Sequence, residues 1–418
     1  MFLYYESNGG NTMRIQFCLF SLFLSVAMPV FAIGCSTRNE EKTAESLRDI
    51  PPEPYQTELL DIAFRAASAM PVYPHIKNRS RAQETVVTAC LELKQPLRAL
   101  RYIEQIDNWR RGTGYADLAF YCAQNGFKNA VGTYLDQAAQ ISEKNEEWRK
   151  DRINVKISRT YTLLGQTEAA ARFERDVEAS ETGKVAQVEA VIGSPDSFDE
   201  IMKDLDTLVS DNNFDTVKNA LDAYPVLYNR FYEDIEKRTL IERKIRTAWV
   251  SIPISIRIDL LTKMADFSLT REDRVKALEM VDEAKTMMDS AIGQLRFRIP
   301  IWAKLAQLRY HAGDKEQARK EMKDALGMFD KNRAKIVNIY RAGILRSIAE
   351  AYQAMDDTTI ARDLYKRALE AGIENPNSRP RAEDLTAICC SMALHAVEPG
   401  EKLFGRIREI HDGLGNPW

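Results

Sequence analysis

Apolar residues recur through most of the chain at spacings of three and four, the period of an α-helix with one buried side. Residues 118–122 form one such stretch and residues 131–138 form the next. Gln124-Asn125-Gly126 separates them, and a glycine here is typical of a helix end with left-handed backbone. The pattern therefore predicts two helices joined by a short turn, and similar pairs are expected from residue 55 onward.

One hairpin pattern recurs. A large residue, Leu, a small residue and then Tyr mark the first helix, a glycine marks the turn, and Ala, an aromatic residue and Ala mark the second helix. The two clearest copies comprise Trp302, Leu305, Ala306, Gly313, Ala318, Met322 and Ala325, and then Leu345, Ile348, Ala349, Tyr352, Ala361, Tyr365 and Ala368. Arg309 breaks the first copy, and Asp356 replaces the turn glycine of the second. Weaker copies lie within 86–103, 118–138 and 157–170.

This pattern resembles the tetratricopeptide repeat. The resemblance implies an all-α, right-handed superhelix of stacked hairpins, because one helix pair cannot bury its apolar side alone. Gly126 and Gly165 lie 39 residues apart, and Gly313 and Asp356 lie 43 apart, whereas the standard unit has about 34 residues. We therefore expect longer helices than in the standard repeat.

An apolar segment, residues 15–33, follows Met13-Arg14 and is typical of an export signal, so Met13 is interpreted as the true start. Ala32-Ile33-Gly34-Cys35 resembles the bacterial lipobox, although Ala32 stands where Leu is usual. The resemblance implies that Cys35 is diacylated and that its acyl chains, such as palmitate, hold the protein at a membrane. Cleavage after Ala32, giving a soluble periplasmic protein, and a retained membrane helix are the alternatives.

The residues after Cys35 are polar and end in a Pro-rich sequence, which predicts an extended tether. By resemblance to lipoprotein sorting, Ser36 implies the outer membrane, with the folded part facing the periplasm. The chain is thus predicted to contain a signal peptide, a lipidated Cys with its tether, N-terminal hairpins, a divergent helical middle and C-terminal hairpins, at 1–34, 35–54, 55–190, 191–298 and 299–418.

Composition narrows the possible functions. The 58 basic and 61 acidic residues nearly balance, and no basic block is comparable to a surface that follows phosphates, so nucleic acid is not expected as a partner. The four histidines are not in a metal-ligand spacing, and no nucleophile elbow, phosphate loop or dinucleotide fingerprint occurs. We therefore expect a non-enzymatic protein without a metal or cofactor, and no small-molecule ligand.

The cysteines allow two readings. Cys90 and Cys122 occupy equivalent positions of successive first helices and can face each other in an oxidising periplasm. Packed free thiols are the favoured alternative, since free Cys behaves as a small core hydrophobe. Cys389 and Cys390 are adjacent, where a disulfide is strained, so two buried thiols are expected there.

The resemblance also implies where a protein partner from the cell envelope binds, because certain first-helix positions of tetratricopeptide arrays line a concave groove. On this chain those positions are Arg152, Arg159, Gln307, Tyr310, His311, Arg346, Glu350 and Gln353. Two other functions are alternatives: glycan capture with Trp109, Trp148 and Trp249 as sugar platforms, and an envelope enzyme with a helical toroid fold.

Overall fold

The computed structural model describes residues 46–175, 177–178, 187, 190–192, 195–211, 213–249, 252–290 and 293–418. Within these residues the chain forms 19 α-helices, two short 3-10 helices and no strand, so the all-α prediction is confirmed. Ala44–Trp418 form one compact unit. The predicted signal peptide and lipidated Cys35 lie outside the described residues.

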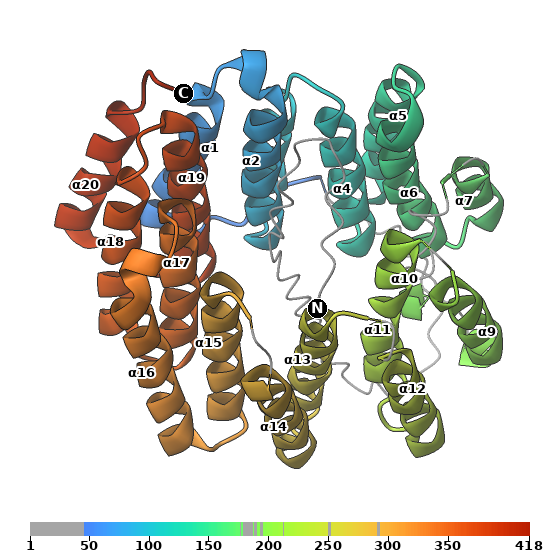
Figure 1. Cartoon of the computed structure of the whole chain (residues 1–418). Helices are drawn as coiled ribbons and strands as arrows, with labels where there is room; N and C mark the ends of the chain where they lie inside the picture. Colours follow the sequence, from blue (N-terminus) through green and yellow to red (C-terminus); the bar gives the residue numbers. More distant parts are fainter. Residues whose placement is uncertain are drawn as a thin grey trace, which may run out of the picture. The chain divides into compact units, whose positions relative to one another are not determined.

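The N-terminal helices are α1 (Pro54–Ala69), α2 (Val72–Glu92), α3 (Pro96–Ile103), α4 (Arg110–Gln124), α5 (Lys128–Glu143), α6 (Glu147–Leu163) and α7 (Thr167–Glu174) (Figure 1). The middle contains α9 (Phe198–Val209), α10 (Phe214–Leu221), α11 (Ala223–Arg230), α12 (Ile235–Ala248), α13 (Ile254–Thr270) and α14 (Arg274–Ser290). The last helices are α15 (Leu295–His311), α16 (Lys315–Asn332), α17 (Asn338–Ala354), α18 (Thr358–Ile373), α19 (Ser378–Leu394) and α20 (Gly400–Asp412).

Most turns fall where the sequence pattern predicts them. Gly126, Gly165 and Gly313 end α4, α6 and α15 with φ angles of 83°, 71° and 104°, a conformation that glycine adopts without a steric cost. Asp356, which replaces the glycine after α17, takes φ 65°. Each turn returns the chain along the preceding helix, and α4–α5, α6–α7, α15–α16 and α17–α18 are closely packed hairpins.

Arg309, which breaks the repeat pattern, is buried in a network of carboxylates. Its guanidinium pairs with Asp282 of α14, with Glu321 of α16 at 3.0 Å, and with Asp314 at 3.4 Å. These carboxylates and the hydrogen bonds they accept outweigh burial and raise the pKa of Arg309. A cation therefore replaces the usual aromatic residue because α14 and α16 both supply partners for it.

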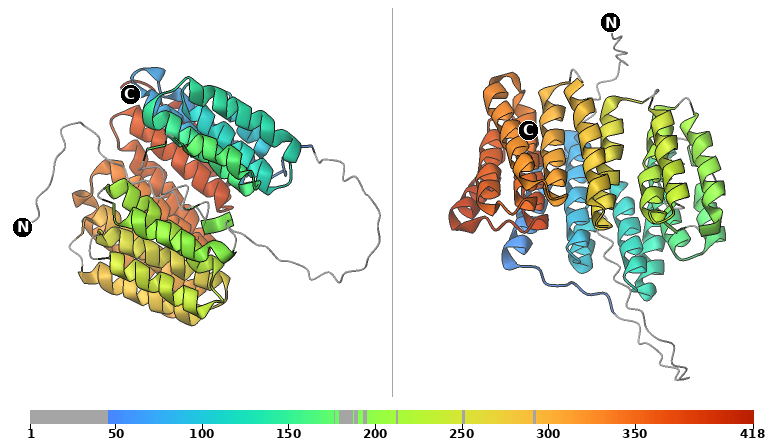
Figure 2. Two further views of the ribbon diagram at one scale, coloured as in Figure 1. Left: turned by 90° about the vertical axis from the view of Figure 1, so that its right-hand side faces the viewer. Right: turned by 90° about the horizontal axis from the view of Figure 1, so that it is seen from below.

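The first helix packs against the last hairpin. Gln56 Nε2 of α1 donates to the carbonyl oxygen of Ala393 in α19 at 2.7 Å, across 337 residues of sequence. Thr386 Oγ1 of α19 donates to the carbonyl oxygen of Ala63 in α1 at 3.2 Å. Figure 2 shows the blue N-terminal helices next to the red C-terminal ones. The N-terminal and C-terminal hairpins thus share one hydrophobic core.

The contact between α1 and α19 makes the C-terminal end of the array differ from the expected hairpin. The C-terminal hairpins were predicted to continue through 299–418, and α19 and α20 do follow each other at the end of this range. However, α1 makes the more extensive contact with α19, and α20 lies against α18 and α1 through the ion pairs Arg406–Glu370 and Arg408–Glu58. α1 therefore serves as the second helix of the α19 hairpin.

A second hydrophobic core lies in the middle of the chain. It is built from α9 to α14 and from Leu305, Leu308 and Ala312 at the end of α15. Trp302 is partly buried and packs against both cores. α15 thus joins the divergent middle to the regular C-terminal hairpins.

Candidate functional site

α6 presents a stripe of cations along one side. Arg149, Arg152, Lys156 and Arg159 follow one another at spacings of three, four and three, which places them on the same helix face. α4 carries a matching stripe with Arg110, Thr113, Asp117 and Phe120, and α2 carries Arg81 and Glu84. The helices α2, α4 and α6 pack side by side.

We call these residues the basic face; its charged members are Arg81, Glu84, Arg110, Asp117, Arg149, Arg152, Lys156 and Arg159. The carboxylate of each helix pairs with cations of the next. Glu84 of α2 pairs with Arg110 of α4, and it accepts from Thr113 Oγ1 at 2.6 Å. Asp117 of α4 pairs with Lys156 of α6 and, at 3.1 Å, with Arg159.

The basic face thus contains six cations and two carboxylates, and three of the cations pair with these carboxylates. Burial lowers the pKa of Arg110, and repulsion from Arg81 and Arg152 lowers it further, against the opposing effect of Glu84. Burial also lowers the pKa of Arg159, which lies over the Phe120 ring at 3.8 Å from its centroid. Among the named residues of α2, α4 and α6, positive charges therefore outnumber negative ones.

A pair of tryptophans borders the basic face. The rings of Trp109 and Trp148 meet edge to face, with centroids 5.2 Å apart. The guanidinium of Arg110 lies 4.5 Å from the Trp109 centroid, and those of Arg149 and Arg152 lie 4.8 and 5.1 Å from that of Trp148. Such contacts attract a cation to the ring and restrict its orientations.

The same contacts bear on the glycan alternative. A sugar platform needs an open ring face, and the rings of Trp109 and Trp148 carry arginines. The third predicted platform, Trp249, has the Arg246 guanidinium 5.5 Å from its centroid. All three tryptophans therefore hold cations of this chain at a ring face.

Three predicted groove residues lie on α15. Tyr310 is buried, with 5% of its surface exposed, and its hydroxyl donates to Asp356 Oδ2 at 3.4 Å. Gln307 is half-buried and His311 is exposed. Partial desolvation, followed by repulsion from Lys304, lowers the pKa of His311. Tyr310 thus belongs to the core rather than to an open surface.

Three others lie on α17. Arg346 pairs with Glu350, whose Oε1 also accepts from Ser391 Oγ of α19 at 2.6 Å. Burial by itself raises the pKa of Glu350, but Arg346, His395 and Ser391 outweigh it and hold this pKa below its ordinary value. The Oε1 atom of Gln353 is buried without a hydrogen-bond partner among the described residues. Arg346 and Glu350 therefore help join α17 to α19.

The predicted groove residues lie at the two ends of one row of packed helices. α15 packs on α17, α17 on α19, α19 on α2, α2 on α4 and α4 on α6. The structure brings Arg152 and Arg159 together on the basic face, while the α15 and α17 residues lie further along the row.

Sequence reasoning missed most of the basic face, including Arg81, Arg110, Arg149 and Lys156. The regular spacing of the α6 cations was visible in the sequence and is the signal that would have identified them. Glu84 and Asp117 were not identifiable, because their pairing depends on how neighbouring hairpins pack.

Among the described residues, no group of His, Cys, Asp and Glu is arranged to hold a metal ion. Cys90, Cys122, Cys389 and Cys390 are buried free thiols, as favoured from the sequence. In the part of the chain that the structure describes, no helix is long and apolar enough to span a bilayer. No model of a known protein family matches the chain, and no match to a curated protein was found.

Proposed function

We propose that this protein is a non-enzymatic scaffold, tethered to a membrane of the bacterial cell envelope, that binds a protein partner through a tetratricopeptide-like, right-handed array of helical hairpins. The observation that carries the proposal is the basic face, on which three neighbouring helices present cations in register. Repetition of charge at equivalent positions suits an elongated partner that contacts several hairpins at once.

The chemistry of the face indicates the character of the partner. Its excess positive charge favours a protein segment that bears carboxylates, because complementary charge steers association and fixes orientation. Arginine and tryptophan are frequent interface anchors, and Arg149 and Arg152 are already oriented against Trp148. Less conformational entropy is then lost when these guanidiniums bind.

The proposed tether is supported by the sequence before residue 55. Acyl chains on Cys35 attach the polar segment to the outer membrane, and the hairpins face the periplasm. Metabolic labelling with radioactive palmitate tests this part of the proposal. Label should enter the native chain and be lost in Cys35→Ser; label retained in that variant refutes lipidation at this residue.

Partner binding is tested by affinity capture from the native envelope after mild cross-linking. Replacing Arg149 and Arg152 together by Ala should weaken capture of the main partner by about 30-fold, the loss expected from one strong anchor. The control replaces Arg65 and Arg243, exposed arginines of α1 and α12, by Ala. If both double variants capture the partner equally well, the basic face is not the partner-binding surface.

A further inference from the structure

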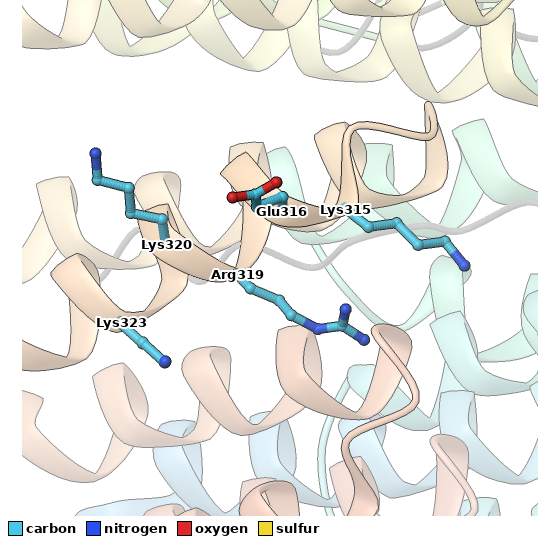
Figure 3. Close-up of a pocket in the computed structure, with 5 residues that line it drawn as sticks. All are labelled: Lys315, Glu316, Arg319, Lys320 and Lys323. Atoms are coloured by element: carbon cyan, nitrogen blue, oxygen red, sulfur yellow. The ribbon is translucent and has the colours of Figure 1, made fainter.

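The outer side of α16 carries a second group of cations, separate from the basic face. Lys315, Arg319, Lys320 and Lys323 are all exposed and lie along the first half of this helix (Figure 3). With Glu316 they line a shallow hollow of about 540 Å³. We call these four cations the α16 patch.

The α16 patch is not neutralised by the protein. Within the described residues, none of its four cations forms an ion pair, whereas Arg309 at the base of the same hairpin pairs with three carboxylates. Glu316 is the one acidic residue lining the hollow. A positively charged surface therefore faces solvent.

Two cations of the patch are held in place by the core. The Nζ atom of Lys315 lies 4.8 Å from the centroid of the Tyr310 ring, and the guanidinium carbon of Arg319 lies 5.3 Å from it. Tyr310 is itself buried and bonded to Asp356. The patch is thus attached to a rigid part of the hairpin.

The outer side of α16 offers charge without an apolar anchor. Of the large apolar residues of this helix, Met322 and Phe329 are fully buried, and Leu326 and Met328 are partly buried and pack against the core. Protein interfaces are generally centred on aromatic or arginine side chains that fill desolvated pockets. The single arginine of the patch, Arg319, is exposed and fills no such pocket. A lysine-rich face of this kind is better suited to a surface of closely spaced, mobile anions, such as the phosphates of a bilayer.

We propose that the α16 patch binds the phosphate headgroups of an anionic bilayer, so that this side of α16 rests on the membrane. The contact is electrostatic, because no side chain of the patch can insert into the acyl region. It needs neither acylation of Cys35 nor the basic face, so it stands or fails separately from the proposed scaffold function.

The test uses residues 44–418, which form a compact unit with their own hydrophobic cores, in flotation with phosphatidylcholine vesicles that contain or lack phosphatidylglycerol. Binding should require phosphatidylglycerol and should be lost at high salt. Lys320→Glu with Lys323→Glu should weaken binding at least about 25-fold, from about fivefold for each cation removed. Lys203→Glu with Lys402→Glu changes the net charge equally at exposed sites elsewhere and should have a small effect.

Several outcomes would overturn the proposal. The first is that the Lys320→Glu, Lys323→Glu variant binds vesicles as well as the unsubstituted unit does. The second is that the control variant loses as much binding as the patch variant, and the third is that the unsubstituted unit does not bind anionic vesicles at low salt. Displacement by inorganic phosphate at matched ionic strength would indicate a site for free anions instead of a bilayer surface. Circular dichroism and thermal melting establish that each variant is folded, so that weaker binding is not a consequence of unfolding.

Discussion

Because α1 provides the second helix of the α19 hairpin, a cavity made in α1 should loosen a segment more than 300 residues away in sequence. Leu60 is fully buried and lies four residues after Gln56 and three before Ala63, on the side of α1 that bonds to α19. Leu60→Ala should cost about 3 kcal/mol, within the usual range for a buried leucine.

The assay is hydrogen exchange followed by mass spectrometry on peptides from Ser378–Leu394. A loss of about 3 kcal/mol corresponds to roughly 100-fold faster exchange of amides that open with the α1–α19 contact. Leu261→Ala is the matched control, because this leucine of α13 is equally buried in the separate core of the middle segment. It should accelerate exchange in α13 and leave α19 largely protected.

Two results would refute this reasoning. Unchanged protection of α19 in Leu60→Ala, with a loss confined to α2, would mean that α19 is stable without α1. Equal acceleration in every helix for both variants would mean that the unit opens only as a whole.

Three further predictions follow from the fold. Arg309→Met should lower the free energy of unfolding, measured by chemical denaturation, by about 3–5 kcal/mol, because Glu321 remains buried without its ion-pair partner. Adding Glu321→Leu should recover stability, and no recovery would argue against an unpaired charge as the cause. Gly126→Ala should lower the free energy of unfolding by about 1 kcal/mol, because the φ angle of Gly126 is 83°. Gly132→Ala, at an exposed position inside a helix, should raise it by about 0.5–1 kcal/mol, and equal effects of the two substitutions would contradict the backbone argument. Burial raises the pKa of Cys122 from 9.0 to about 12, so the thiol ionises at lower pH in the unfolded chain than in the folded one, and the free energy of unfolding should fall as pH rises above 9. Iodoacetamide at pH 8 should label Cys122 only after denaturation, and rapid labelling of the folded protein would contradict this prediction.

Local structure was largely predictable from the sequence, because it depends on nearby residues. The helix ends at Gly126 and Gly313 follow from the need for left-handed backbone, and Asp356 replaces glycine without disturbing the turn. The buried side of α14, with Ala277 and Val281, also follows from its spacing. These features require no knowledge of which hairpins are neighbours.

The remaining features depend on long-range packing. The apolar side of α1 has the same period as that of any other helix, so nothing local identifies α19 as its partner. Arg309 appeared as a defect in the repeat because Asp282 comes from the preceding hairpin. Arg152 and Arg159 were found through the repeat pattern, but the positive charge of the basic face appears only when α2, α4 and α6 are side by side.

The pairing of α1 with α19 also sets an order of events during synthesis. α1 leaves the ribosome before any other described helix, yet its partner helix emerges more than 300 residues later. Until then the side of α1 that packs on α19 lacks its partner helix, although α2 already packs against α1. Contacts of such long sequence separation form slowly. A nascent chain that stops before Ser378 would therefore expose apolar surface on α1 and be prone to aggregate. The complete chain buries this surface against α19.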